Sequence, residues 1–312
     1  MTDSLPTALR VQPHGILAVD KPAGCTSHDV VAWARRALGT RAVGHAGTLD
    51  PMATGLLVIL VGEATKLSGH LTAQSKSYEA TVRFGVATDS LDADGTVTHR
   101  SPEGAAPPSF VAVEAALAAM VGPIEQVPPA VSAIKVDGEA MHARVRRGET
   151  VELAPRAVVL HAAGVGAVRP DPPEADVSMT VSKGFYVRAL ARDLAASLGT
   201  FGHLTALRRT RSGALDVAES VSGQRLREAG RGDPEARAEV MAALRPVAWA
   251  ATLMGAVTVS DEDAAALRVG KRVAGEGAEG VVLVLDPAGV PVCVGERQAG
   301  VLVVVRGLLP TG

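Results

Sequence analysis

The sequence VGHAGTLDPMATGLLVILVG, residues 43–62, places a short polar turn directly before an unbroken apolar run. The turn carries His45, Thr48 and Asp50 among glycines, which let another backbone or a flat ligand come close. The run GLLVILVG, residues 55–62, is typical of a strand that is covered on both faces. The composition of the turn is equally compatible with a simple Asx-turn, so a catalytic role for Asp50 needs support from elsewhere in the chain.

The segments on either side of this turn predict a mixture of strands and helices. GILAVDKPAG, residues 15–24, predicts a short strand that ends in a turn. TSHDVVAWARRALG, residues 26–39, predicts an amphipathic helix with Ser27 as its N-cap. KSYEATVRFGV, residues 76–86, alternates apolar and polar side chains and therefore predicts a half-buried strand.

The middle of the chain continues this pattern. FVAVEAALAAMVG, residues 110–122, predicts a helix whose inward side chains are Phe110, Val113, Leu117, Met120 and Val121. Strands are expected at residues 157–168 and 206–215, and residues 176–199 predict a strand followed by a helix. Residues 224–245 are charged, rich in alanine and typical of helix.

From about Ala248 the sequence pattern changes to short apolar runs separated by turns. We therefore expect a main domain at residues 1–245 and a small β-rich domain at residues 246–312. Strands and helices of the main domain mix without a regular βαβ order. This pattern predicts an α+β fold with a mixed, largely antiparallel sheet and flanking helices.

The charge balance gives no global attraction to a polyanion, because 31 basic residues face 33 acidic ones. A local stripe is basic, however: residues 183–211 hold Lys183 and five arginines against a single acid, Asp193. Such a stripe can bind phosphates on an otherwise neutral protein, although a solvated helix face would look the same.

Several classes of site lack support. Cys25 and Cys293 lie far apart and outside any zinc-ligand spacing. TDSLDADG, residues 88–95, resembles a calcium loop, but Ser90 and Ser101 occupy two of its anchor positions. It is either an acidic turn or the source of an acid that orients a cation near an active centre. We expect no metal and no nucleotide cofactor, since the sequence has no Gly-x-x-x-x-Gly-Lys-(Ser/Thr) motif and no strand-linked Gly-x-Gly-x-x-Gly motif.

The N-terminal segment lacks a basic region followed by an apolar one, and apolar runs long enough to cross a bilayer, about 20 residues, are missing from the sequence. We therefore expect a cytoplasmic protein without a membrane partner. The sequence shows no extended apolar stripe of the kind that mediates self-association, so we expect a monomer.

Read together, segments spread over residues 15–217 resemble, in order, the bacterial tRNA pseudouridine-55 synthases of the TruB type. GHAGTLDPMATGLLVI is similar to the family's catalytic-aspartate motif, and VSKGFYVRALARDLAASLG is similar to its Ser-Lys-Gly-x-Tyr-(Ile/Val)-Arg segment. The other matching segments are GILAVDKPAGCTSHDVV, KSYEATVRFGVATDSLDADG, PPAVSAIKVDGEAMHARVRRGE and LTALRRTRSGAL. Two positions depart from the family pattern: Ala46 and Phe185 stand where threonine is common.

The resemblance implies a pseudouridine synthase core followed by a PUA-like C-terminal domain. It also implies a reaction without a cofactor, in which a uridine at position 55 in the T arm of tRNA is flipped out and becomes pseudouridine. Asp50 matches the family's nucleophile, which attacks either the ribose C1′ or the uracil C6. A carboxylate suits covalent catalysis because it is already ionised at neutral pH.

The resemblance also assigns partners to Asp50. Arg188 matches the arginine that pairs with the nucleophile, and Asp92 matches an acid of the same charge network. Tyr78 matches a pocket tyrosine that stacks on the base, and His45 matches a residue that holds the flipped nucleotide. The remaining substrate-site candidates are Tyr186, Leu207, which matches a pocket-lining residue, and Lys21, which matches a motif lysine of structural or phosphate-facing role.

Each of these residues also has an ordinary structural reading. Tyr78 and Leu207 could be core residues, Arg188 a helix-surface residue and His45 a turn residue. Two other functions stay open as well: a non-catalytic tRNA-binding or tRNA-folding protein with the same fold, and a synthase that acts on another RNA, such as the type directed by a guide RNA. The C-terminal segment from about residue 248 on has five basic and seven acidic residues. This charge gives little support for contact with RNA.

Overall fold

The computed structural model describes residues 12–129, 135–136, 139–140 and 153–310. Most of the segment PPAVSAIKVDGEAMHARVRRGE therefore lies outside the described residues. The chain forms two compact units. Unit 1 comprises Met1–Asp50, Leu56–Thr72 and Ala214–Gly312, and unit 2 comprises Pro51–Gly55 and Ala73–Gly213.

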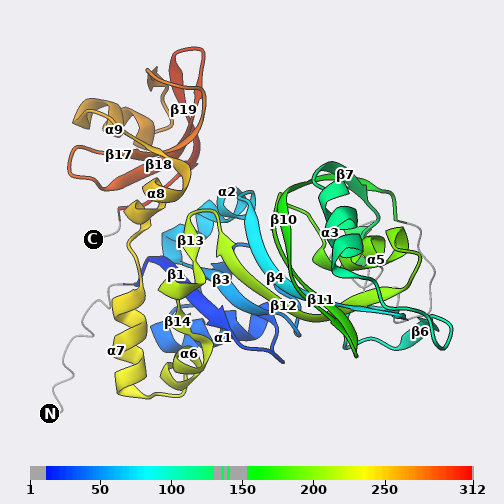
Figure 1. Ribbon diagram of the computed structural model, residues 1–312. Coiled ribbons are helices and arrows are strands. Elements are labelled where there is room, and N and C mark those ends of the chain that lie inside the picture. The colour runs from blue at the N-terminus through cyan, green and yellow to red at the C-terminus, as the bar shows by residue number, and fades with distance from the viewer. Residues whose placement is uncertain (1–11, 130–134, 137–138, 141–152, 311–312) are drawn as a thin grey trace, which may run out of the picture. The chain divides into compact units, whose positions relative to one another are not determined.

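Unit 1 is built around short strands and the helices that cover them (Figure 1). Strand β1 lies between β14, to which it is parallel, and β3, and β2 pairs with β3 in the antiparallel sense. Helices α6 and α7 pack beside α1. The bounds of these elements are β1 Gly15–Lys21, α1 Ser27–Leu38, β2 Val43–His45, β3 Thr54–Val61, α2 Ser68–Thr72, β13 Leu215–Asp216, β14 Val221–Ser222, α6 Gly223–Ala229, α7 Pro234–Ala243 and α8 Ala251–Met254.

The sequence stretch 55–62 is the centre of this unit. From Gly55 to Val61 every residue of β3 is buried, as expected for a strand covered on both faces. Its side chains Leu56, Val58 and Leu60 belong to one hydrophobic cluster with Ile16 of β1. This apolar cluster holds the strand that directly follows the polar turn in the sequence.

Helix α1 differs from its expected start by one residue. Thr26, not Ser27, is the N-cap: its hydroxyl accepts the N–H of Asp29, and the Asp29 carboxylate accepts the N–H of Thr26. This reciprocal capping box satisfies two N–H groups that an α-helix otherwise leaves open. The side chain of Ser27, freed from capping, points into the buried interior, with 1% of its surface exposed.

The C-terminal part of unit 1 is a five-stranded sheet in the order β15–β17–β18–β19–β16. It has a hydrophobic cluster of its own, which includes Leu267, Val284 and Leu302. The sequence predicts four of its strands but neither β16 nor helix α9, which Ser260 caps. The bounds are β15 Ala256–Thr258, α9 Asp261–Arg268, β16 Val273–Ala274, β17 Gly280–Leu285, β18 Pro291–Gln298 and β19 Val301–Gly307.

Unit 2 is an antiparallel sheet in the order β12–β4–β11–β10–β7. The first two residues of β3, Thr54 and Gly55, also belong to it and pair with β12 in parallel. The sheet is therefore mixed but largely antiparallel, which confirms the expected fold class. The bounds are β4 Lys76–Phe84, β5 Val86–Thr88, β6 Val97–Arg100, α3 Phe110–Ala119, β7 Gly122–Gln126, β8 Lys135–Val136, β9 Glu139–Ala140, β10 Arg156–Pro170, β11 Pro173–Val181, α5 Val187–Ser197 and β12 Gly202–Ser212.

Helices α3 and α5 cover one face of this sheet (Figure 1). The alternation expected for β4 is confirmed: Ala80, Val82 and Phe84 are buried, Thr81 and Arg83 between them are half-buried, and Glu79 is exposed. The opposite face of the sheet carries hydroxyl and charged side chains. Unit 2 thus has a covered apolar face and an open polar one.

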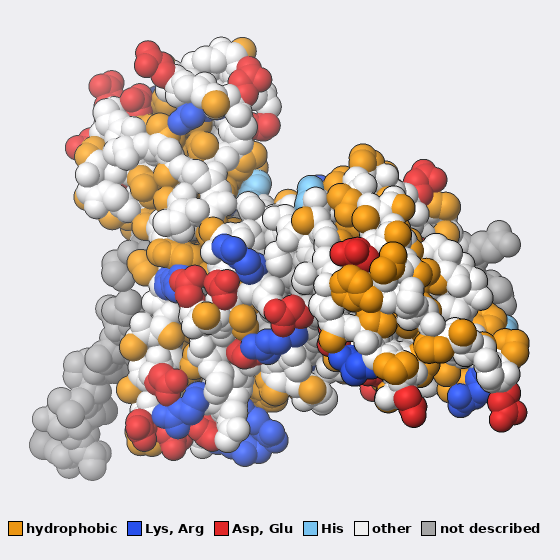
Figure 2. Space-filling model, viewed as in Figure 1, with side chains coloured by type: hydrophobic (Ala, Val, Ile, Leu, Met, Phe, Trp, Pro, Cys, Tyr) orange, Lys and Arg blue, Asp and Glu red, His pale blue; other side chains and the backbone are white. Residues whose placement is uncertain are grey.

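One expectation for α3 is wrong. Val113 and Leu117 are buried, but Phe110 and Val121 are 41% and 44% exposed. Phe110 is the first residue of the helix and Val121 lies beyond its last, so neither is held against the sheet by the helical repeat. Figure 2 shows apolar side chains gathered over α3.

Candidate active site

The turn that bears Asp50 is fixed at its start by strand pairing. Antiparallel pairing joins β2 to β3 with His45 opposite Ile59, and the Ala46 N–H donates to the carbonyl of Val58 at 2.9 Å. Gly47 then adopts a φ of 103°, which favours glycine because it has no Cβ. The carboxylate of Asp50 follows as a half-buried side chain.

Lys21, which the sequence assigns to a structural or phosphate-facing role, is fully buried. Its ammonium group donates to the carbonyl oxygens of Pro22 at 3.0 Å and Cys25 at 2.7 Å. These bonds fold the segment 22–25 back on β1 immediately before the capping box of α1. The lysine therefore helps to determine where the N-terminus of this helix lies.

His45, the residue expected to hold a flipped nucleotide, lies at the end of β2. Its ring meets the ring of His28 edge to face, with centroids 5.8 Å apart and an interplanar angle of 88°. His28 belongs to the first turn of α1. The N-terminal turn of α1 is thus in contact with the start of the polar turn.

Sequence reasoning assigns Ser27 to helix capping and misses its contact with the turn of Asp50. Its hydroxyl accepts the N–H of Leu49 at 2.9 Å and donates to the carbonyl of Leu49 at 3.1 Å. Leu49 directly precedes Asp50 in the chain. A separation of 22 residues joins the two partners, so no local sequence pattern reveals the contact.

In unit 2, Arg188 and Asp92 form a buried ion pair. Each residue is 5% exposed, and Arg188 Nη1 lies 3.4 Å from Asp92 Oδ2. The same Nη1 donates to the carbonyl of Ser90 at 2.8 Å. The other carboxylate oxygen of Asp92 accepts the Ser90 hydroxyl at 2.5 Å and the N–H of Asp94 at 3.2 Å.

The loop that carries Asp92 has an unusual backbone conformation and is hydrogen-bonded to the sheet. Leu91 adopts a positive φ of 63°, which is rare for a residue with a branched side chain. Its carbonyl accepts the N–H of Leu204 on β12 at 3.1 Å, so the loop is tied to the sheet. The acidic turn is therefore an ordered element that presents a carboxylate to the first turn of α5.

Tyr78 and Leu207 lie on neighbouring strands of unit 2. Tyr78 is opposite Arg209 in the register of β4 and β12, and Ala80, two residues on, is opposite Leu207. Tyr78 is half-buried, whereas Leu207 is 8% exposed and Arg209 only 1%. The tyrosine therefore stands beside a buried guanidinium, on the face of β4 opposite that of Glu79.

A second buried cation lies on the same face of β4. Lys76 is 6% exposed, and its burial, together with the charge of Arg209, lowers its pKa to about 8. Its ammonium group donates to the carbonyl of Gln74 at 2.7 Å. Burial in a low-dielectric surrounding disfavours the charged form of a lysine, which accounts for the direction of the shift.

Tyr186 precedes α5 at the N-cap position, and both its backbone N–H and its carbonyl are hydrogen-bonded to one side chain. The side chain of Gln126, which is 1% exposed, accepts the N–H of Tyr186 at 3.0 Å and donates to its carbonyl at 3.3 Å. Gln126 ends β7, so the start of α5 is fixed to the far edge of the sheet. This anchoring also fixes the position of Arg188, two residues further on.

The basic stripe of residues 183–211 is only partly available to solvent. Lys183 and Arg211 are exposed, and Arg192 and Arg208 are half-buried. Arg192 donates to the Asp193 carboxylate at 2.7 Å. The stripe's two buried arginines, Arg188 and Arg209, face the interior, so the surface it offers to phosphates is smaller than the sequence suggests.

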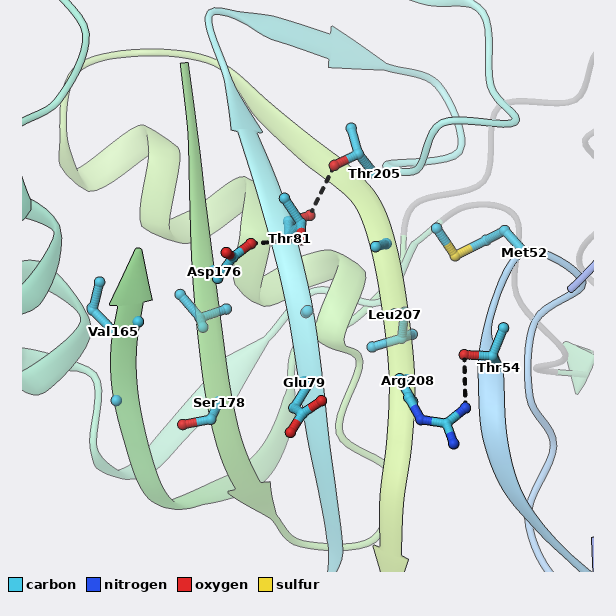
Figure 3. Close-up of a pocket in the computed structure, with 15 residues that line it drawn as sticks. Met52, Thr54, Glu79, Thr81, Val165, Asp176, Ser178, Thr205, Leu207 and Arg208 are labelled. Carbon is cyan, nitrogen blue, oxygen red and sulfur yellow. Dashed lines mark hydrogen bonds between the residues drawn. The ribbon is translucent and has the colours of Figure 1, made fainter. Parts of the chain in front are cut away.

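A hollow of about 680 Å³ lies on the open face of the sheet in unit 2 (Figure 3). Thr81 donates to the Asp176 carboxylate at 2.8 Å there, and Arg208 donates to Thr54 at 3.5 Å. Leu207 contributes to its lining. Because most of the hollow's polar groups are on the face of Glu79, away from the ring of Tyr78, it is a separate feature from the tyrosine side of the sheet.

Among the described residues, helices with the length and apolar content needed to cross a bilayer do not occur.

Residues 35–187 match the model of the TruB family pseudouridylate synthase N-terminal domain, and residues 188–251 match that of the tRNA pseudouridylate synthase B C-terminal domain. The tRNA pseudouridine synthase B of Corynebacterium aurimucosum is 43% identical over 309 residues, 97% of this chain and 98% of that protein. The enzyme of the same name from Cutibacterium acnes is 49% identical over 83% of this chain and 85% of its own.

Solved structures agree on the fold. A chain of the archaeal box H/ACA sRNP Nop10–Cbf5 complex superposes with a TM-score of 0.71 at 21% identity, covering 98% of this chain and 89% of that one. At this identity the likeness concerns the fold alone.

Proposed function

This chain belongs to the TruB family of pseudouridylate synthases, and from that premise we propose that it converts the uridine at position 55, in the T arm of tRNA, into pseudouridine. In this isomerisation the N1–C1′ bond of the uridine breaks and a C5–C1′ bond forms. The proton of C5 leaves and N1 gains one. The atoms balance without an oxidant, a reductant or a cofactor.

The observation that carries the proposal is the anchored turn of Asp50. A half-buried carboxylate follows a segment that hydrogen bonds hold at Ala46 and at Leu49. A nucleophile that is already in position avoids the entropic cost of being oriented during the reaction. We propose that Asp50 forms the transient covalent bond, to either the ribose C1′ or the uracil C6.

Arg188 is proposed as the cation that keeps the nucleophile ionised, in the role the family resemblance gives it. Support comes from the surroundings of its guanidinium, which Asp92 and the Ser90 carbonyl hold in a buried site. A fixed cation stabilises a neighbouring carboxylate more than a mobile one, because little conformational freedom is lost when they interact. Asp92 is proposed as the acid of this network.

Base-binding roles are proposed for the remaining candidate residues. A stacked uridine must be flipped out of the RNA, at a cost of a few kcal/mol. Stacking on an aromatic ring returns about 1–3 kcal/mol per base, and the half-buried ring of Tyr78 is suited to this. We propose His45, Tyr186, Leu207 and Lys21 as the other residues that bind or shape the substrate site.

The division into a catalytic domain at residues 1–245 and a PUA-like domain at residues 246–312 is likewise a proposal. It is supported by a hydrophobic cluster within the β15–β19 sheet that includes Leu267 and Leu302, although Leu283 and Val294 of the same sheet belong to the cluster of Ile16. We propose that the protein acts as a monomer on tRNA.

The test uses tRNA transcribed with tritium at C5 of uridine, because pseudouridine formation releases that tritium to water. Asp50→Asn removes the nucleophile and should abolish release while leaving tRNA binding largely intact, as measured by filter retention. Asp261→Asn, which alters an exposed carboxylate of α9, is the matched control and should release tritium at the wild-type rate.

Each alternative has its own outcome. Binding of tRNA by the wild-type chain without tritium release would favour the non-catalytic RNA-binding function. Release from another RNA but not from tRNA would favour a synthase with a different target. Normal turnover by Asp50→Asn would exclude the proposed nucleophile.

A further inference from the structure

The hydroxyl of Ser27 makes both of its hydrogen bonds to one residue of the catalytic turn. It accepts the N–H of Leu49 and donates to the carbonyl of Leu49, at 2.9 and 3.1 Å. Ser27 and Leu49 are 1% and 4% exposed. Buried backbone groups need a partner, and here one side chain serves both polar groups of the residue that precedes Asp50.

Ser27 is itself held in place. It is the first residue of α1, and the Thr26–Asp29 capping box fixes that end of the helix. The Lys21 ammonium group fixes the segment before it through the carbonyls of Pro22 and Cys25. Hydrogen bonds at three successive residues, Cys25, Thr26 and Ser27, therefore link β1, the N-terminus of α1 and the backbone of Leu49.

On the premise of the proposed function, we propose that Ser27 is a positioning residue for the nucleophile Asp50. Its hydroxyl sets where the carboxylate lies by holding the peptide groups on either side of Leu49. Without it, both Leu49 groups would be buried and unsatisfied, and the turn would move to bond water. A displacement of about 1 Å at a reacting group can reduce a rate about 100-fold.

The proposal predicts that Ser27→Ala lowers the single-turnover rate of tritium release about 100-fold, with little change in tRNA affinity. Ser27→Thr keeps the hydroxyl and should recover most of the rate. Ser222→Ala is the matched control, since Ser222 caps α6 in the same unit through the N–H of Arg225 at 3.1 Å. It should lower stability but leave the rate per folded molecule unchanged.

A readout independent of catalysis separates this proposal from the proposed function. Hydrogen exchange should show the Leu49 amide losing protection in Ser27→Ala but not in Ser222→Ala. A wild-type chain that releases no tritium would overturn the proposed function, while the exchange result would still decide whether Ser27 holds the turn. A wild-type rate in Ser27→Ala, a loss of rate no larger than in Ser222→Ala, or unchanged Leu49 protection would overturn the positioning role.

Discussion

Arg188 and Arg169 are both paired with aspartates in unit 2, but the two pairs differ in burial and in length. The side chains of Arg188 and Asp92 are 6% and 7% exposed, and their closest charged atoms are 3.4 Å apart. Those of Arg169 and Asp176 are 39% and 42% exposed, and their closest charged atoms are only 2.6 Å apart. The shorter contact therefore lies in the more solvated surroundings.

Burial, not distance, should decide which pair matters. Water screens an exposed pair, so that such pairs contribute little to stability even when the geometry is good. Removing one partner of a buried pair leaves the other as an uncompensated charge in a low-dielectric site. The Arg188–Asp92 pair, although its contact is longer, should therefore be more sensitive to mutation than the Arg169–Asp176 pair.

Asp92→Asn should have the largest effect. It removes the negative charge that lies 3.4 Å from the buried guanidinium of Arg188 and should lower the free energy of unfolding by up to about 3–5 kcal/mol. Urea denaturation measures this quantity, and tritium release should fall as well because the guanidinium is no longer fixed. Asp94→Asn changes an exposed carboxylate two residues away and serves as the control. Equal losses in the two variants would show that burial does not govern the pair.

A buried cation in a different setting sharpens the comparison. Burial and the nearby charge of Arg209 lower the pKa of Lys76 to about 8. Below that pH the lysine is charged in both the folded and the unfolded chain, and the folded state bears the full free-energy cost of burying the charge. Between pH 8 and the ordinary lysine pKa of 10.5 the unfolded chain binds more protons, so the stability of the wild-type protein should rise with pH.

Lys76→Met should remove this dependence. Its stability at pH 7 should exceed that of the wild type by up to about 3 kcal/mol, the equivalent of the pKa shift, and the difference should shrink as the pH approaches 10. Urea midpoints measured from pH 7 to pH 10 give the comparison. Lys271→Met, at an exposed lysine, should show no such trend. A difference between Lys76→Met and the wild type that stays constant with pH would refute the titration of Lys76.

The sequence predicts most of the fold because the signals of its strands and helices are local. The alternation of residues 76–86 places Glu79 and Ala80 on opposite faces of β4, as observed. Helix ends are harder to place: Thr26 and Ser27 are both good caps, and only the structure shows which hydroxyl bonds to Asp29. Helix α9 was missed because the apolar runs around it favour strands.

The candidate site is less accessible to sequence reasoning than the fold. A family motif identifies Asp50, Arg188 and Asp92 as candidates, but it carries no information about burial. The contact of Ser27 with Leu49 joins residues that no periodicity connects. The sequence predicts more exposed positive charge in residues 183–211 than the structure has, because Arg188 and Arg209 are buried. Such features depend on tertiary packing, which brings together residues distant in the chain.

Arg169→Gln should have the smallest effect, because its side chain is 39% exposed to solvent, although the guanidinium bonds the Asp176 carboxylate twice, at 2.6 and 2.8 Å. The urea midpoint at pH 7 should stay within the spread of repeated measurements. The Arg169 hydrogen bonds are the main cause that lowers the pKa of Asp176, so in the variant this pKa should return toward the ordinary value of about 4. Carboxyl-carbon NMR titration measures that shift directly.

The sign of any residual effect of Arg169→Gln follows from the same shift. A carboxyl group whose folded pKa is lowered adds stability above its unfolded pKa and loses it as the pH falls. Any small deficit of the variant should thus vanish in acid, and also in high salt, which screens exposed charges. A deficit as large as that of Asp92→Asn, unchanged by salt, would mean that the short contact on the open face of the sheet is desolvated after all, and that distance rather than burial ranks the two pairs.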